Sequence, residues 1–121
     1  MKIYLDDDDK YRKTPEGFER VHDLPELVGL LESRPDEPIE VMDFDNDLGD
    51  ETPEGRYIIK WLYDNHRDRW PHEIRVHTDN PEAAIDIRTF AENVRKRGLS
   101  KENETPSEFD EMYEERARRW I

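Results

Sequence analysis

Three short polar groups in this chain carry the residue types that phosphate chemistry with a metal ion requires. Four aspartates follow the run KIYL, the run DFDND follows IEVM, and the run HTDN follows EIRV. Carboxylates that share one site repel one another unless a cation or protons lie among them. Mg²⁺ prefers an all-oxygen site of this kind and leaves room for waters and a phosphate. The predicted ligands of Mg²⁺, or of Mn²⁺, are four aspartates: Asp6, Asp7, Asp45 and Asp47.

The third group adds a side chain that can transfer a proton. His77 is suited to acid–base chemistry because the ordinary pKa of histidine lies near neutrality. Thr78 and Asn80 can donate hydrogen bonds to phosphate oxygens, and so can the backbone N–H groups of a helix that begins at Asn80. The other three histidines show no partner pattern and are interpreted as structural or surface residues: His22, His66 and His72.

Each of these features also has a purely structural interpretation. A run of aspartates most often forms a solvated turn, and Asp45-Asn46-Asp47 ahead of Gly49 fits a turn as well. Asn80 before Pro81 is a favourable helix N-cap whatever else it does. The functional interpretation is favoured because three separate predicted strands end in polar groups, where turn residues alone would be enough.

Alternating strands and helices are predicted to position these groups. The predicted strands are Lys2–Leu5, Phe18–Val21, Ile39–Phe44 and Glu73–His77. Helices are predicted after the N-caps Asp23, Thr52 and Asn80, and the last of them ends at Gly98. Such an order forms parallel βαβ units, whose ligands gather at the carboxyl ends of the strands. If the first, third and fourth strands are neighbours, all three polar groups meet at one edge of the sheet.

Length and pattern predict one domain with an appendage. Residues 1–98 of the 121 form the α/β domain, and residues 99–121 are predicted to be a linker and a C-terminal helix. The apolar residues of that helix recur on one face: Phe109, Met112, Tyr113, Ala117 and Trp120. This face is predicted to dock on the domain, on a second copy in a homodimer, or on a protein partner.

Composition excludes several classes of protein. The net charge of −13 disfavours non-specific binding to nucleic acid, because a polyanion repels an acidic surface. The absence of cysteine excludes disulfides, zinc–thiolate sites and cysteine nucleophiles. No apolar run approaches the length of a membrane span, and the N-terminus has no secretory h-region. We therefore expect a cytoplasmic protein without membrane association.

The polar groups also resemble the motifs of a known family. The runs LDD, RKTPEGF, FDNDLGD and VHTDNP resemble the cyclic-phosphate processing receiver domain family, whose pattern is L-D-D, R-x-x-P-x-G-W, D-H-D-L-G and H-S-x-N-P. The resemblance covers about residues 1–97. It implies a receiver-like (flavodoxin-like) parallel sheet of about four strands flanked by helices. It also implies binding or hydrolysis of cyclic phosphates, such as those of RNA ends or cyclic nucleotides.

The resemblance can be carried over residue by residue. Asp6 and Asp7 match the first acidic pair of the family, and Arg12 matches the arginine before the proline. Asp45 matches the phosphoacceptor position of a receiver, and Asp47 matches the second acid of D-H-D. His77 and Asn80 match the last motif, in which Thr78 replaces the serine. The loop before Pro15 is a little longer than usual. Asn46 stands where the family has histidine, and asparagine binds a phosphate but is neither acid nor base near neutral pH.

Two functions remain open at this point. The first is a metal-assisted phosphoesterase or binder acting on cyclic phosphates, an RNA end or a small phosphorylated ligand. In it Asp45 and His77 are catalytic, and Lys10, Arg12, Asn46, Thr78 and Asn80 bind substrate. The alternative is a non-catalytic receiver-like module that sequesters a nucleotide or binds a protein partner. An ordinary phosphorylation switch is disfavoured, because no β-rich run ending in lysine follows Gly98.

Overall fold

The computed structural model describes residues 1–50 and 52–99. The predicted linker and C-terminal helix lie outside the described residues, apart from Leu99, so their docking remains a prediction. The elements in chain order are β1 (Lys2–Leu5), β2 (Glu19–Val21), α1 (Leu24–Ser33), β3 (Val41–Phe44), α2 (Gly55–Asn65), the 3₁₀ turn η1 (Arg67–Arg69), β4 (Glu73–Val76) and α3 (Pro81–Arg97).

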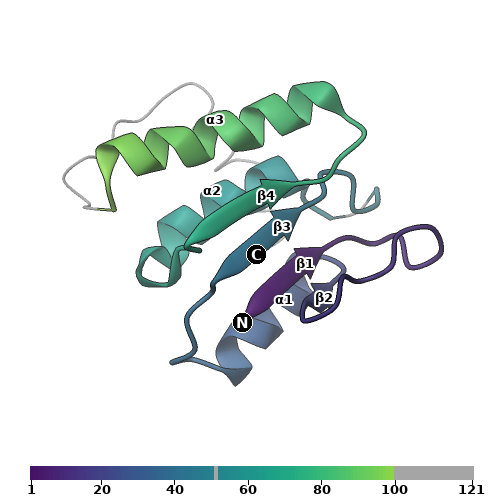
Figure 1. Ribbon diagram of the computed structural model, residues 1–121, viewed down its shortest axis with the longest axis horizontal. Coiled ribbons are helices and arrows are strands. Elements are labelled where there is room, and N and C mark those ends of the chain that lie inside the picture. The colour runs from purple at the N-terminus through teal and green to yellow at the C-terminus, as the bar shows by residue number, and fades with distance from the viewer. Residues whose placement is uncertain (51, 100–121) are drawn as a thin grey trace.

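The four strands form one parallel sheet in the order β2-β1-β3-β4 (Figure 1). Leu5, at the end of β1, is level with Val21 of β2 and with Phe44 of β3, and Phe44 is level with Val76 of β4. All four strands therefore end at the same edge. The predicted parallel α/β sheet is confirmed, as is the prediction that the first, third and fourth strands are neighbours. The order is flavodoxin-like.

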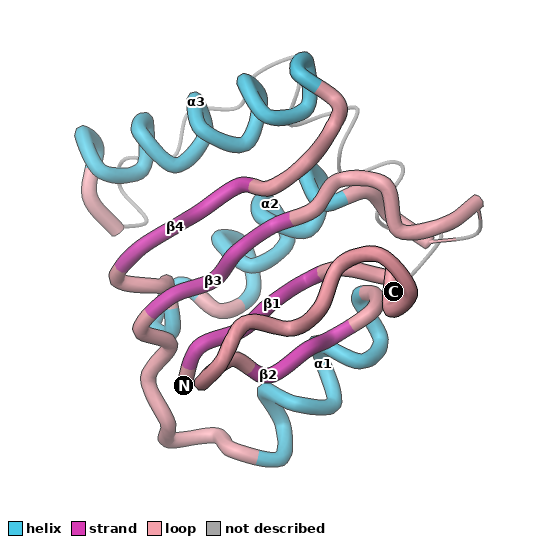
Figure 2. Tube along the Cα trace, turned by 45° about the vertical axis from the view of Figure 1, so that its right-hand side comes forward, coloured by secondary structure: helices cyan, strands magenta, loops and turns pink. Residues whose placement is uncertain are grey.

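The connections place the helices on one side of the sheet. The crossovers through α1 and α2 run in the same direction across the sheet, so right-handed connections place both helices on the same face. Figure 1 shows both helices behind the sheet, and α3 packs against α2 and β4. The connection from β1 to β2 runs the opposite way, contains no helix, and crosses the other face as the loop of residues 6–18 (Figure 2).

Alternation along the strands separates the core from the polar face. Ile3, Leu5, Met42 and Phe44 are fully buried on the helix side, whereas Tyr4 points to the other face. The helices contribute further fully buried side chains to the same core: Leu24, Leu27, Leu31, Ile58, Ile59 and Leu62. Each such side chain contributes about 1.5–3 kcal/mol by leaving water. None of the described helices is long and apolar enough to cross a bilayer.

Two of the three predicted helix starts are confirmed. The side chain of Asp23 accepts a hydrogen bond from the Glu26 N–H, and that of Asn80 accepts one from the Ala83 N–H. Gly98 follows α3 with a φ of 80°, a conformation that favours glycine.

The third predicted start, at Thr52, is wrong. Helix α2 begins at Gly55, after Glu54. The physical reason is a close contact: the Gly55 N–H donates to the Asn46 carbonyl at 2.9 Å, which brings the first turn of α2 against the end of β3.

Candidate active site

Three aspartates from the ends of β1 and β3 form one acidic cluster. The hydrogen-bond ladder continues past the strands, because the Asp45 N–H donates to Leu5 and the His77 N–H donates to Phe44. This places Asp6, Asp45 and His77 in one row at the carboxyl edge. Asp6 and Asp45 are buried, Asp7 is exposed, and one carboxylate oxygen of each lies within 4.8 Å of the others.

Burial and mutual repulsion shift the pKa values of the cluster in different directions. Burial raises the pKa of Asp45, and the nearby charge of Asp6 adds to this shift. Burial also raises the pKa of Asp7, assisted by the charges of Asp6, Asp8 and Asp47. Burial opposes the ionised form of Asp6 as well, but hydrogen bonds from the Asp8 N–H, His77 and Arg12 lower its pKa. The donor set is carboxylate oxygen alone, with one side open to solvent, and therefore fits a hard divalent cation such as Mg²⁺.

Arg12 brings positive charge to the cluster, in addition to Arg20, whose Nη1 lies 3.7 Å from Asp6 Oδ1. The Nη1 of Arg12 lies 3.3 Å from Asp6 Oδ2 and 3.2 Å from Asp45 Oδ2, and its Nη2 lies 2.7 Å from Asp79 Oδ2. These charge-assisted contacts tie the loop of residues 6–18 to the carboxyl edge of the sheet. The structure therefore places Arg12, predicted from the sequence to bind substrate, beside the acidic cluster.

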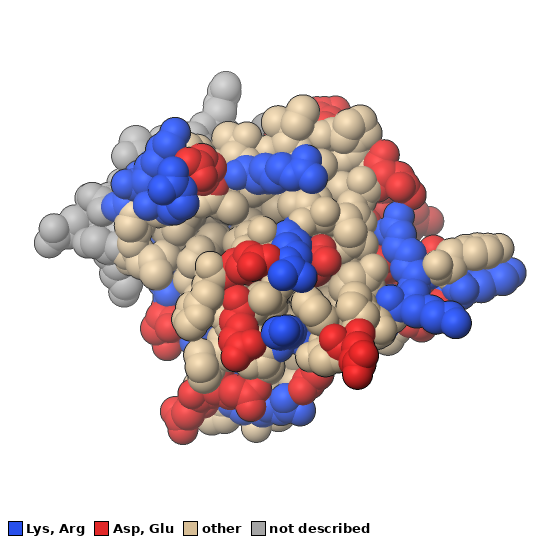
Figure 3. All heavy atoms as spheres, viewed as in Figure 1, with Lys and Arg blue, Asp and Glu red and all other residues tan. Residues whose placement is uncertain are grey.

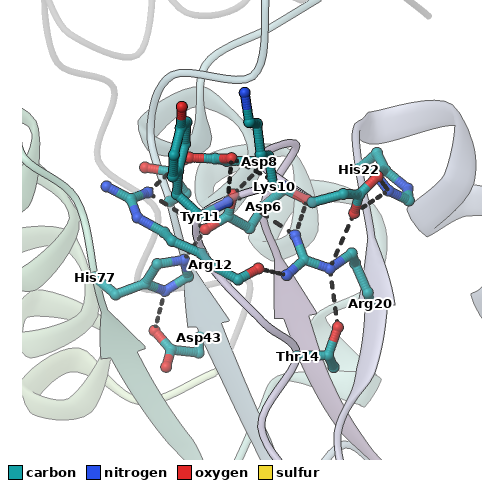
Figure 4. Close-up of polar contacts among 12 residues, drawn as sticks. Asp6, Asp8, Lys10, Tyr11, Arg12, Thr14, Arg20, His22, Asp43 and His77 are labelled. Carbon is teal, nitrogen blue, oxygen red and sulfur yellow. Dashed lines mark hydrogen bonds and ion pairs between the residues drawn. The ribbon is translucent and has the colours of Figure 1, made fainter.

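Arg20 holds the loop that carries Arg12 (Figure 4). Its guanidinium donates to the carbonyl oxygens of Asp6, at 2.9 Å, and Arg12, and its Nε donates to Thr14 Oγ1 at 2.9 Å. Arg20 was not predicted from the sequence. It is adjacent to Tyr4 in the sheet register, on the same face as Asp6, so the alternation of β1 and β2 was the signal that could have found it.

The ring of His77 is held on three sides. Nδ1 lies 2.6 Å from Asp43 Oδ1, Nε2 lies 2.8 Å from Asp6 Oδ2, and the ring stacks on Tyr4 at 4.3 Å between centroids. Burial alone would lower the pKa of His77, but the hydrogen bonds and charges of Asp43 and Asp6 outweigh it and raise the pKa above the ordinary 6.5. The two carboxylates therefore favour the protonated form of the His77 ring.

A second histidine fixes the far end of the loop. His22, interpreted from the sequence as a structural or surface residue, lies between Glu26, 2.8 Å from Nδ1, and Asp9, 2.9 Å from Nε2. Asp9 also lies 3.4 Å from Arg20. No spacing rule links all four residues, since Asp9 comes from the loop, Arg20 and His22 from β2 and its end, and Glu26 from α1.

Two predicted substrate-binding residues, Lys10 and Asn46, make their contacts away from the cluster. The Lys10 ammonium lies 5.1 Å from the centroid of the Tyr11 ring. Asn46 is fully buried: its amide donates to Glu54 at 3.0 Å and its oxygen accepts from the Arg56 N–H at 3.1 Å. Its side chain therefore holds the start of α2.

The remaining predicted residues lie beside the cluster. Asp47 is exposed and influences Asp7 through its charge, but it is outside the three-aspartate group. Thr78 Oγ1 accepts a hydrogen bond from the Asn80 N–H at 3.2 Å, and Asn80 caps α3. These two residues shape the backbone that follows His77.

The surface around the cluster has mixed charge despite the acidic composition. Acidic and basic side chains alternate over the face of the sheet opposite α1 and α2 (Figure 3). The charge of Arg75 on this face is balanced by Glu73, and that of Arg20 by Asp9. Arg12, at the cluster itself, is likewise paired, with Asp6, Asp45 and Asp79.

Comparison with known proteins gave one match. A family model described as the cyclic-phosphate processing receiver domain matches residues 1–93. No curated protein and no solved structure matches the chain. The matched range includes all four strands, the loop that carries Arg12, and every member of the acidic cluster.

Proposed function

Because the chain belongs to the cyclic-phosphate processing receiver domain family, we propose that it is a metal-assisted phosphoesterase that hydrolyses cyclic phosphates. The family assignment associates the chain with cyclic-phosphate processing. The observation that supports hydrolysis is the position of His77, whose Nε2 lies beside the carboxylate cluster. The substrate class is a 2′,3′-cyclic phosphate at an RNA end or a cyclic nucleotide.

Asp6, Asp7 and Asp45 are the residues that would hold the metal, Mg²⁺ or Mn²⁺. A bound divalent ion supplies Lewis acidity toward the phosphoryl oxygens and toward water. Arg12, beside the same carboxylates, binds a phosphoryl oxygen of the substrate. Its charge offsets the negative charge that develops on the phosphoryl group.

The protein side chains move the protons of the reaction. Asp45, whose pKa burial raises, accepts a proton from water as the water oxygen forms a bond to phosphorus. The ester P–O bond of the ring breaks, and His77 gives its Nε2 proton to the leaving ribose oxygen. One water is consumed, the product is a phosphomonoester, and solvent returns the proton from Asp45 to His77.

The alternative is a module that binds a cyclic phosphate without turnover. The observation that favours it is Asn46, which stands at the histidine position of the family motif and has its side chain bonded to Glu54 and to the Arg56 N–H. If hydrolysis in this family needs the histidine of both motifs, this chain, which retains only His77 of the two, would bind the cyclic phosphate without hydrolysing it.

The experiment is an assay of the full chain against a panel of cyclic phosphates. The panel contains 2′,3′-cyclic and 3′,5′-cyclic mononucleotides, cyclic dinucleotides and an RNA with a cyclic-phosphate end. Each is incubated with Mg²⁺, Mn²⁺ or EDTA, and ³¹P NMR measures the phosphomonoester. Asp45→Asn and His77→Gln are the test variants. Asp36→Asn, which removes an exposed charge between α1 and β3, is the matched control.

We expect turnover that requires the metal. Asp45→Asn and His77→Gln should each lower the rate by about 100-fold or more, and Asp36→Asn should leave it unchanged. Absence of product with either metal, or equal rates in all variants, would refute the hydrolase. Thermal stabilisation by one of the nucleotides without product would instead support the binding module.

A further inference from the structure

A carboxylate of the DFDND run to which the sequence analysis assigned no role lies on β3 next to the proposed site. Asp43 is two residues before Asp45 on β3 and therefore points to the same face. Its side chain is only 14% exposed, and its neighbours in the sheet register are Tyr4 and Arg75. A charge at this depth in a central strand is costly unless it is paired.

The partner of Asp43 is the ring nitrogen of His77 that faces away from the cluster. Asp43 Oδ1 lies 2.6 Å from Nδ1, and Tyr4 covers one face of the ring with an interplanar angle of 6°. The contact with Tyr4 prevents the ring from tilting, and the contact with Asp43 prevents it from flipping. Both contacts leave Nε2 directed at Asp6.

We propose that Asp43 is a positioning residue for the reaction: it accepts the Nδ1–H of His77 and so makes Nε2 the nitrogen that delivers a proton to the leaving oxygen. The inference rests on the proposed function, because a delivered proton needs a substrate. A carboxylate on the far nitrogen of a histidine fixes both the orientation and the tautomer of the ring. Asp43 itself touches neither the substrate nor the metal ligands in this arrangement.

The chain offers a matched pair of variants. Asp43→Asn removes the charge with little change in size. Glu73→Gln does the same for an exposed carboxylate of β4 that lies next to Arg75. Two readouts are compared. The first is the ring Nδ1–H signal of the full chain in proton NMR, with ¹⁵N-labelled histidine and the His77→Gln variant for assignment. The second is kcat and KM for a cyclic phosphate that the panel assay identifies.

We expect a strongly downfield Nδ1–H signal in the wild type and in Glu73→Gln, and its loss or upfield shift in Asp43→Asn. In Asp43→Asn, kcat should fall about tenfold or more with KM nearly unchanged, since a misoriented ring impairs proton transfer rather than binding. An unchanged Nδ1–H signal in Asp43→Asn would overturn the proposal. So would loss of the signal with an unchanged kcat, which would make Asp43 purely structural.

Failure of the proposed phosphoesterase function can be distinguished from failure of the proposed role of Asp43. If the wild-type chain hydrolyses no cyclic phosphate, the phosphoesterase proposal fails. The Nδ1–H signal then decides by itself whether Asp43 holds the ring, because that measurement needs neither substrate nor metal.

Discussion

Gly55 is the position at which one added carbon should disturb both the fold and the site. It is the first residue of α2, and a Cβ built there would lie 1.9 Å from the carbonyl oxygen of Asp45 and 3.1 Å from the Cα of Asn46. Close carbon–oxygen contacts lie at about 3.3–3.6 Å, so alanine requires the start of α2 and the end of β3 to separate by about 1–2 Å. Both obstructing atoms are backbone and cannot rotate away.

The size of the effect follows from this geometry. Overpacking by the added methyl group lowers the free energy of unfolding by about 1–3 kcal/mol. Separation also weakens the hydrogen bond from the Gly55 N–H to the Asn46 carbonyl, 2.9 Å long, which contributes about 0.5–1.5 kcal/mol. The higher helix propensity of alanine compared with glycine offsets about 0.5–1 kcal/mol of this destabilisation. We therefore expect Gly55→Ala to lower the free energy of unfolding by about 2 kcal/mol, within bounds of about 0.5–4 kcal/mol.

Gly29 provides the control for this prediction. It lies in the middle of α1, and nothing lies within 4 Å of a Cβ built on it. Gly29→Ala should therefore stabilise the protein by about 0.5–1 kcal/mol. Urea denaturation followed by circular dichroism measures both variants. Magnesium titration of Gly55→Ala should also show weaker binding, because Asp45 moves with its backbone. Equal unfolding free energies for Gly55→Ala and the wild type would refute the reasoning.

Three further predictions concern charged side chains. Arg12→Gln should raise the Mg²⁺ affinity about tenfold in calorimetry, since the ion no longer competes with the guanidinium for the buried carboxylates; weaker Mg²⁺ binding would contradict this. Arg69 is buried and donates to three carbonyl groups at and beyond the end of α1, so Arg69→Met should cost about 2–4 kcal/mol in urea denaturation, and a cost near zero would contradict the capping role. Hydrogen bonds from His22 to Glu26 and Asp9 raise its pKa above 6.5. Its stabilisation should therefore be complete below about pH 6 and be lost as the pH rises through the raised pKa. The difference in urea midpoint between wild type and His22→Gln should shrink accordingly, and a constant difference would contradict this.

Much of the fold and part of the site could be predicted because the signals are local. The apolar runs that become strands end in Asp6, Asp45 and His77, and parallel strands in register bring such ends together. The N-caps Asp23 and Asn80 are also local, since each acts within three residues.

The rest depends on contacts between elements that no spacing in the sequence reveals. Asp43 and Arg20 acquire their roles from neighbours across the sheet, so they resemble ordinary strand polar residues in the sequence. Gly55 carries no turn signal of its own, and only the approach of β3 excludes a side chain there. Asn46 was expected to face a phosphate, but its neighbours Glu54 and Arg56 are brought to it by the fold of the β3–α2 connection.

The helix-free connection between β1 and β2 divides the site into two parts with different tolerance to change. Asp6, Asp45 and His77 directly follow strand ends, whereas Asp7 and Arg12 belong to a loop held by Arg20 and His22. Insertions in that loop leave the sheet intact, because loop closure costs little extra per added residue. Under the proposed function, replacing the part of this loop beyond Asp7 would change the ligand while the proposed metal ligands and His77 are kept. Grafting the 8–18 segment of another family member would therefore be a direct way to redirect specificity.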